Sequence, residues 1–177
     1  MSEPRITFLG AAGTLAGGGG GAMRPGVLQA ERVLALWGFL LNLVWEAGQT
    51  PLYEDAGRGL AYLAWTRLHC TAGDVLILLG AFWLTSLICR SRRWFARPGA
   101  LAPGLFVVLG LAYTAWSEWA NTSLRDAWQY RPQMPTLFGI GLAPLLQWLV
   151  IPPILVLLLR RSPRLNERVG EPRRSTP

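Results

Sequence analysis

The sequence predicts an all-α integral membrane protein, with four transmembrane helices in an up-and-down bundle and both termini in the cytoplasm. Two observations predict this fold. Of the 177 residues, 51% are hydrophobic and only 15% are charged, and the apolar residues gather into four runs separated by short arginine-bearing segments. Each run approaches the length of about 20 residues that a helix needs to cross a hydrocarbon core of about 30 Å.

The four expected helices span residues 33–50, 70–89, 103–120 and 137–159. Each range holds at most one charged residue, and a charge at the centre of a helix costs about 2.5 to 3.5 kcal/mol on insertion scales. Residues 32–161 therefore form one transmembrane domain. Residues 1–31 are expected to be a disordered glycine-rich segment, with Met23 as an alternative translation start. Residues 162–177 are expected to be a disordered, basic cytoplasmic tail.

The arginines predict the orientation, because short cytoplasmic segments are enriched in Lys and Arg. All 17 basic residues are arginine. Thirteen lie in the N-terminal flank, the second loop and the C-terminal tail, whereas the first and third loops hold only Arg58, Arg67, Arg125 and Arg131. We interpret the lack of lysine as the codon bias of a GC-rich bacterial genome, which places the chain in the bacterial inner membrane. Topology thus explains the net charge of +7, and we expect no nucleic-acid partner.

Polar side chains inside the apolar helices point to function, because such groups are rare in a membrane. Two helices carry them at the spacing i, i+4, i+7, which puts them on one face: Asn42, Glu46 and Gln49 in the first, and Thr114, Glu118 and Asn121 in the third. The other two helices add His69, Cys70 and Asp74 at the start of the second, and Gln147 in the fourth. With the predicted topology, the three carboxylates and the only histidine meet at one level near the outer face.

We expect Glu46 and Glu118 to be the central acids of a catalytic site, with Asp74 and His69 as proton exchangers. Neighbouring carboxylates in a low dielectric cannot all be ionised, so a protonated and an ionised acid would form a general acid–base pair. The alternative is a divalent cation held by the same four residues. Asp74 also fits a helix cap. The residues expected to bind or orient a substrate are Asn42, Gln49, Asn121, Gln147, Trp45, Trp116 and Trp119.

The predicted function is the binding of a cation or a lipophilic substrate with carboxylate assistance, and an enzyme and a binding protein fit this pattern equally. Asn42 and Gln147 also fit plain hydrogen bonds between transmembrane helices. The first alternative function is an accessory or assembly subunit of a larger membrane complex, or of a homo-oligomer. A small transporter is the third, because the repeated polar spacing of the first and third helices would suit a duplicated unit. The sequence contains no P-loop, HExxH, GxSxG or CxxC motif.

Overall fold

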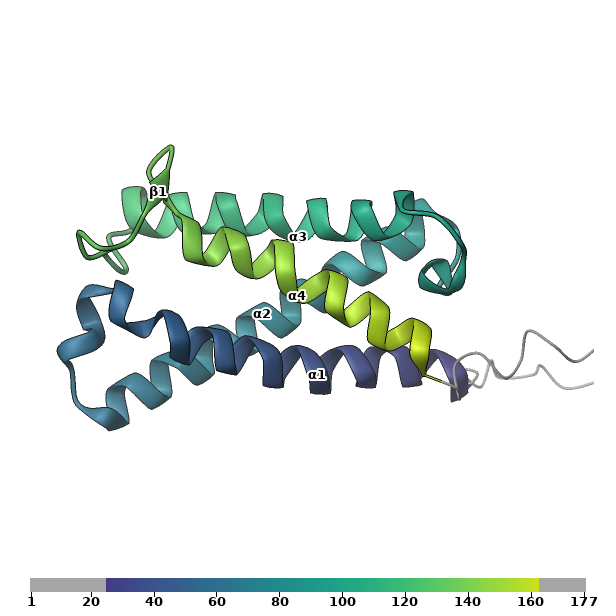
Figure 1. Ribbon diagram of the computed structural model, residues 1–177, viewed down its shortest axis with the longest axis horizontal. Coiled ribbons are helices and arrows are strands. Elements are labelled where there is room, and N and C mark those ends of the chain that lie inside the picture. Colours follow the sequence, from purple (N-terminus) through teal and green to yellow (C-terminus); the bar gives the residue numbers. More distant parts are fainter. Residues whose placement is uncertain (1–24, 163–177) are drawn as a thin grey trace, which may run out of the picture.

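The computed structural model describes residues 25–162. Four long helices run along the length of the molecule, the second and fourth of them obliquely, and neighbouring helices run antiparallel (Figure 1). They are α1 (Pro25–Gln49), α2 (Leu60–Ile88), α3 (Leu101–Trp119) and α4 (Leu142–Arg161). Among the described residues, α2, α3 (counted to Leu124) and α4 are long and apolar enough to cross a membrane. This confirms the predicted all-α class and gives three candidate membrane-spanning helices.

Short elements connect the helices. They are η1 (Thr50–Leu52), η2 (Glu54–Gly57), η3 (Trp94–Ala96), the π-helical turn η4 (Ala120–Leu124), β1 (Thr136–Leu137) and β2 (Ile140–Gly141). β1 and β2 pair antiparallel, with Thr136 opposite Gly141. The α1–α2 and α3–α4 connections lie at the same end of the molecule (Figure 1), and an isolated bridge between Tyr53 and Tyr130 joins them. This paired-loop end covers the site described below.

Three helices begin or end away from their predicted positions. α1 begins at Pro25, inside the segment predicted to be disordered, and proline suits the first turn of a helix because its missing N–H is not needed there. α2 begins at Leu60 rather than residue 70, because Arg67, predicted to be a loop residue, is held inside the protein by ion pairs. α4 begins at Leu142 rather than residue 137, because Phe138 and Gly139 form a turn with φ of 52° and 80°. Two positive φ values suit a two-residue hairpin and exclude a helix.

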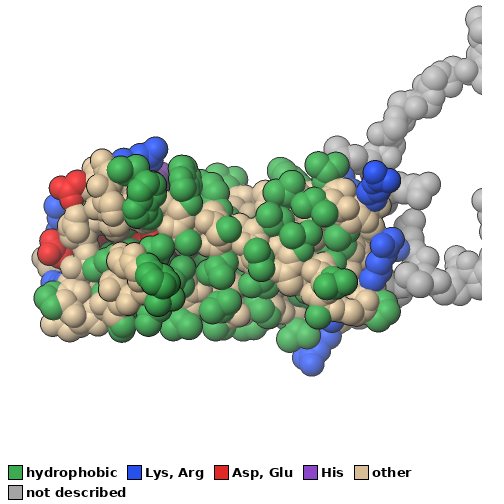
Figure 2. Space-filling view, turned by 90° about the horizontal axis from the view of Figure 1, so that it is seen from above, with side chains coloured by type: hydrophobic (Ala, Val, Ile, Leu, Met, Phe, Trp, Pro, Cys, Tyr) green, Lys and Arg blue, Asp and Glu red, His purple; other side chains and the backbone are tan. Residues whose placement is uncertain are grey.

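The remaining domain predictions concern residues at the two ends. Residues 1–24, with the alternative start at Met23, and residues 163–177 lie outside the part of the chain that the structure describes. Figure 2 shows a band of hydrophobic side chains between an end that displays acidic residues and an opposite end where arginines gather. The acidic end is the paired-loop end.

An aromatic cluster closes the core at the arginine-bearing end. The Trp94 ring lies 5.6 Å from that of Phe82 and 5.3 Å from that of Phe106, measured between centroids. Further along, α3 and α4 approach closely at Gly110, where a Cβ atom would lie only 2.0 Å from the Trp148 ring. Such dense packing leaves no room at this contact, in contrast to the gap between α2 and α3 near the paired loops.

Candidate functional site

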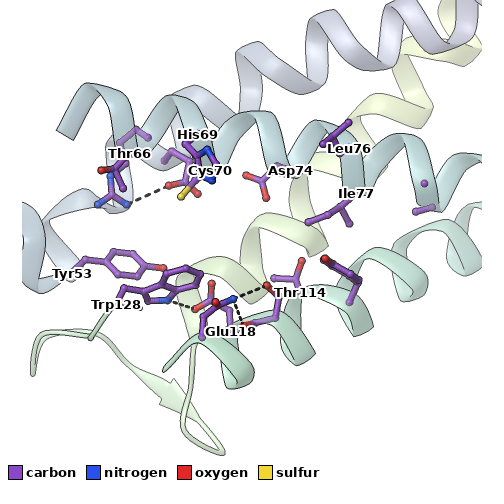
Figure 3. Close-up of a pocket in the computed structure, with 18 of the residues that line it drawn as sticks. Tyr53, Thr66, His69, Cys70, Asp74, Leu76, Ile77, Thr114, Glu118 and Trp128 are labelled. Carbon is purple, nitrogen blue, oxygen red and sulfur yellow. Dashed lines mark hydrogen bonds and ion pairs between the residues drawn. The ribbon is translucent and has the colours of Figure 1, made fainter. Parts of the chain in front are cut away.

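A cavity of about 760 Å³ lies between α2 and α3 below the paired loops (Figure 3). Its polar end is lined by Glu46, Asp55, Arg67, His69, Asp74 and Glu118. Its apolar end is lined by Leu76, Ile77, Ala81, Leu84, Leu109 and Tyr113. Cavities of about 300 to 1,000 Å³ are typical of small-molecule sites. The cavity therefore has the size of a ligand site. Its polar end suits the head of an amphipathic molecule, and its apolar end suits the chain.

Two glycines of α2 leave room for this cavity. Gly73, Ile77, Gly80 and Leu84 all line it, at the spacing that keeps helical residues on one face. A Cβ atom added at Gly73 or Gly80 would meet no described atom within 4 Å. Glycine inside a helix costs about 0.5 to 1 kcal/mol relative to alanine. The sequence thus carries two helix-weakening residues at positions where a side chain would enter the cavity.

Arg67 is the centre of the polar end. Its Nη2 donates to both carboxylate oxygens of Asp55, at 2.7 and 2.6 Å, and its Nη1 donates to Glu46 Oε2 at 3.4 Å. Glu46 Oε1 accepts a further hydrogen bond from Gln49 Nε2 at 2.8 Å. The guanidinium lies over the Tyr53 ring, 5.3 Å from its centroid. Arg67 is 7% exposed, so this ion-pair group is an internal structure that ties the first loop to α1 and α2.

Residues of the α3–α4 connection donate hydrogen bonds to Glu118. Trp128 Nε1 donates to Glu118 Oε2 at 3.3 Å, and the Tyr130 hydroxyl donates to the same oxygen. Gly141 allows this approach, because a Cβ there would lie 3.1 Å from the Tyr130 ring. Burial raises the pKa of the Tyr130 phenol, and the adjacent Glu118 carboxylate raises it further. Burial also raises the pKa of Tyr53, so both phenols remain donors at neutral pH.

Asp74 belongs to a hydrogen-bond network that joins three helices. Gln147 Nε2, from α4, donates to Asp74 Oδ2 at 2.9 Å and to Asn42 Oδ1 at 2.6 Å. Asn42 Nδ2 in turn donates to the Gly38 carbonyl at 2.6 Å. Asn42 and Gln147 are buried. Both interpretations of these amides therefore have a structural basis: they link helices, and they fix the orientation of Asp74.

The structure brings part of the predicted site together. Glu46, Asp74, His69, Glu118 and Asn121 line the cavity, and Figure 3 shows Asp74 and Glu118 extending from α2 and α3 into the space between these helices. Asn121 hydrogen-bonds to Ser117 of its own helix. His69 lies on an exposed part of α2 and stacks on Trp65, with 6.3 Å between ring centroids. Within residues 25–162, no three His, Cys, Asp or Glu side chains are grouped to hold a metal ion.

The three predicted tryptophans lie outside this cavity. Trp116 and Trp119 are 54% and 46% exposed on the surface of α3. Trp45 lies on the other side of α1, where its Nε1 donates to the Ala143 carbonyl at 3.2 Å and its ring lines an apolar groove against α4. Their closeness to the acids in sequence was misleading, because adjacent residues of a helix point in different directions.

Sequence reasoning missed several residues that the structure places around the acids: Asp55, Tyr53, Arg67, Thr114 as a cavity residue, Trp128 and Tyr130. Two signals were available. Arg67 precedes Asp74 by seven residues, which puts both on one face of a single helix. Trp128 and Tyr130 are separated by one residue in a non-helical segment, so both side chains can point the same way.

The arrangement can supply acceptors and donors within a largely apolar enclosure. Glu118 and Asp74 face the cavity from opposite helices, and protein donors hold one oxygen of each. Such groups can bind a charged or hydrogen-bonding head, or exchange a proton with it. Comparison with known protein families, curated proteins and solved structures finds no match for the chain.

Proposed function

We propose that the chain is a bacterial inner-membrane protein in which all four long helices cross the bilayer and both termini are cytoplasmic. α1 supports this, because it lies against α2 and α4 over its length and runs antiparallel to both (Figure 1). The arginine distribution supports the orientation. Because Arg67 is buried in ion pairs, the exposed positive charge opposite the termini is smaller than the sequence count indicated, which strengthens the asymmetry.

Within the membrane, the proposed function is to bind a lipophilic molecule that has a polar head. The observation that carries this proposal is the cavity between α2 and α3, whose polar residues lie at the paired-loop end and whose apolar residues lie deeper along the helices. The apolar chain of such a ligand would lie against the apolar residues of the cavity. Its polar head would form hydrogen bonds or ion pairs with the carboxylates at the other end. The preference for a molecule with both a polar head and an apolar chain requires both ends of the cavity, because burying a polar group against apolar residues alone is unfavourable.

A second candidate is acid–base catalysis on the bound molecule. One contact favours it: the Tyr130 hydroxyl donates to Glu118 at the cavity wall. A carboxylate and a phenol joined by a hydrogen bond can act as an acid–base pair when a substrate lies within reach. Conversion of the bound molecule, rather than its release unchanged, would distinguish this candidate from simple binding.

Native mass spectrometry of the protein, extracted gently from its own membranes, tests the binding proposal. The Gly80→Phe variant would place a ring in the apolar part of the cavity, whereas Gly104→Phe adds the same ring on α3 away from the cavity. Both added Cβ atoms start in open space, so both variants are expected to fold.

We expect a bound lipophilic mass on the wild type and on Gly104→Phe, and its loss from Gly80→Phe. An equal bound mass on all three proteins would contradict the proposal, because the ligand would then lie elsewhere. A stoichiometric protein partner without a small ligand would instead favour an accessory subunit.

A further inference from the structure

Two of the four carboxylates that line the cavity, those of Asp74 and Glu118, each keep one oxygen free. Glu118 Oε2 accepts both protein hydrogen bonds and Asp74 Oδ2 accepts the one from Gln147. Within the described residues, Glu118 Oε1 and Asp74 Oδ1 have no hydrogen-bond partner, and neither atom is fully shielded from the cavity. Protein donors thus hold one oxygen of each carboxylate. The other oxygen remains an acceptor, on the α2 side of the cavity for Asp74 and on the α3 side for Glu118.

Thr114 adds a third acceptor that has no partner. Its side chain is 7% exposed and lines the cavity one turn before Glu118, and Figure 3 shows it on the same wall of α3. Its Oγ1 has no hydrogen-bond partner among residues 25–162. A buried hydroxyl without a partner costs about 1 to 3 kcal/mol. A bound donor would remove this cost, which makes Thr114 an indication of a ligand that is independent of the acids.

Asp74 and Glu118 lack a cationic partner within residues 25–162. Arg67 already faces two carboxylates, Glu46 and Asp55, so it does not neutralise Asp74 or Glu118. His69, which also lines the cavity, stacks on Trp65 at an exposed position. No described cationic side chain forms an ion pair with Asp74 or Glu118.

We propose that the head of the ligand is a primary ammonium group, carried on a single alkyl or similar apolar chain. This inference rests on the proposed binding function and specifies its ligand. An –NH₃⁺ group has three N–H donors and no acceptor, which matches the two accessible carboxylate oxygens of Asp74 and Glu118 together with the buried, unpartnered hydroxyl of Thr114. A quaternary ammonium has the charge without the donors, and an alcohol has one donor without the charge. One chain, rather than two, suits a cavity of about 760 Å³.

Three probes with the same twelve-carbon chain test the head group: dodecylamine, dodecyltrimethylammonium and dodecanol. Binding is measured at neutral pH as the shift in the thermal unfolding midpoint of the full chain in nonionic detergent, and converted to an apparent Kd by linkage. The variants are Glu118→Gln, Asp74→Asn and Thr114→Val. Glu54→Gln is the matched control, because Glu54 is exposed on η2 and does not line the cavity. Gly80→Phe places a ring in the cavity, so any shift that a probe still causes in this variant measures its partition into the micelle and not binding in the cavity.

The wild type and Glu54→Gln are expected to bind dodecylamine at least about tenfold more tightly than the other two probes, since each charge-assisted hydrogen bond lost is worth about a factor of ten or more. Glu118→Gln and Asp74→Asn should each remove most of this preference, and Thr114→Val should reduce it several-fold, while dodecanol binding stays unchanged. Equal binding of dodecylamine and dodecanol, or of dodecylamine and dodecyltrimethylammonium, would overturn the ammonium assignment and leave the cavity as a lipophile site. If no probe stabilised the wild type more than Gly80→Phe, the binding function itself would be wrong.

Discussion

Replacing Arg67 with methionine tests whether the polar end is built around a buried ion-pair group. Arg67 and Glu46 are 7% and 5% exposed, and the side chain of Asp55 is 17% exposed. The substitution keeps much of the apolar stem of Arg67 but removes every N–H that Glu46 and Asp55 accept from it. Both carboxylates would then lack this counter-charge.

The expected loss in the free energy of unfolding is about 3 to 5 kcal/mol, the range found when one partner of a buried ion pair is removed. An exposed pair would give about 0 to 1 kcal/mol, so burial decides the prediction. Arg58→Met is the matched control, because Arg58 is exposed and lies over the Tyr62 ring at 4.5 Å. It should lose about 0.5 to 1 kcal/mol.

Unfolding in mixed micelles containing increasing sodium dodecyl sulfate, followed by tryptophan fluorescence and far-ultraviolet circular dichroism, measures both variants. The triple variant Arg67→Met, Glu46→Gln, Asp55→Asn should recover most of the loss, because no uncompensated charge then remains. A loss for Arg67→Met that is no larger than the loss for Arg58→Met would refute the reasoning. So would a triple variant as unstable as the single one.

Two further predictions concern packing and pH. Gly110→Ala should destabilise the protein by about 1 to 3 kcal/mol in the same assay, because its Cβ would overlap the Trp148 ring; Gly104→Ala, in open space, should gain up to about 1 kcal/mol. Stability should fall as pH rises above about 10, because the raised pKa values of Tyr53 and Tyr130 mean that the unfolded chain loses protons there before the folded one. A double Tyr→Phe variant that keeps the same slope above pH 10 would show that other groups cause it.

The helices could be predicted because long apolar runs, each of about the length needed to cross a membrane, are visible in the sequence without knowledge of the packing. The prediction succeeded for the number of long helices and for their approximate positions. It missed the start of α2 because Arg67 looked like a loop residue. Arg67 is buried on α2 because it pairs with Asp55 and Glu46. These partners lie 12 and 21 residues away in the sequence, so no local pattern predicts the pairing. The hairpin before α4 depended on the positive φ of Phe138, which is uncommon for a bulky residue.

The convergence of three acids could be predicted because antiparallel helices bring their positions to one level. Glu46, Asp74 and Glu118 do line one cavity. Their partners could not be predicted, because these come from loops whose conformation depends on tertiary contacts: Asp55 from the first connection, and Trp128 and Tyr130 from the third. The only sequence feature that indicates the cavity is a pair of glycines, Gly73 and Gly80, on one face of the largely apolar α2.

The geometry of α2 sets the depth at which a ligand would lie. Arg67 and Asp74 are seven residues apart, so the free carboxylate oxygen lies about 10 Å below the ion-pair group that closes the polar end. From Asp74 to Leu84, the last apolar residue of this helix that lines the cavity, the helix rises about 15 Å. That is about half of a hydrocarbon core of about 30 Å. If α2 crosses the bilayer as proposed, a chain bound with its head at Asp74 would extend along about half of the hydrocarbon core.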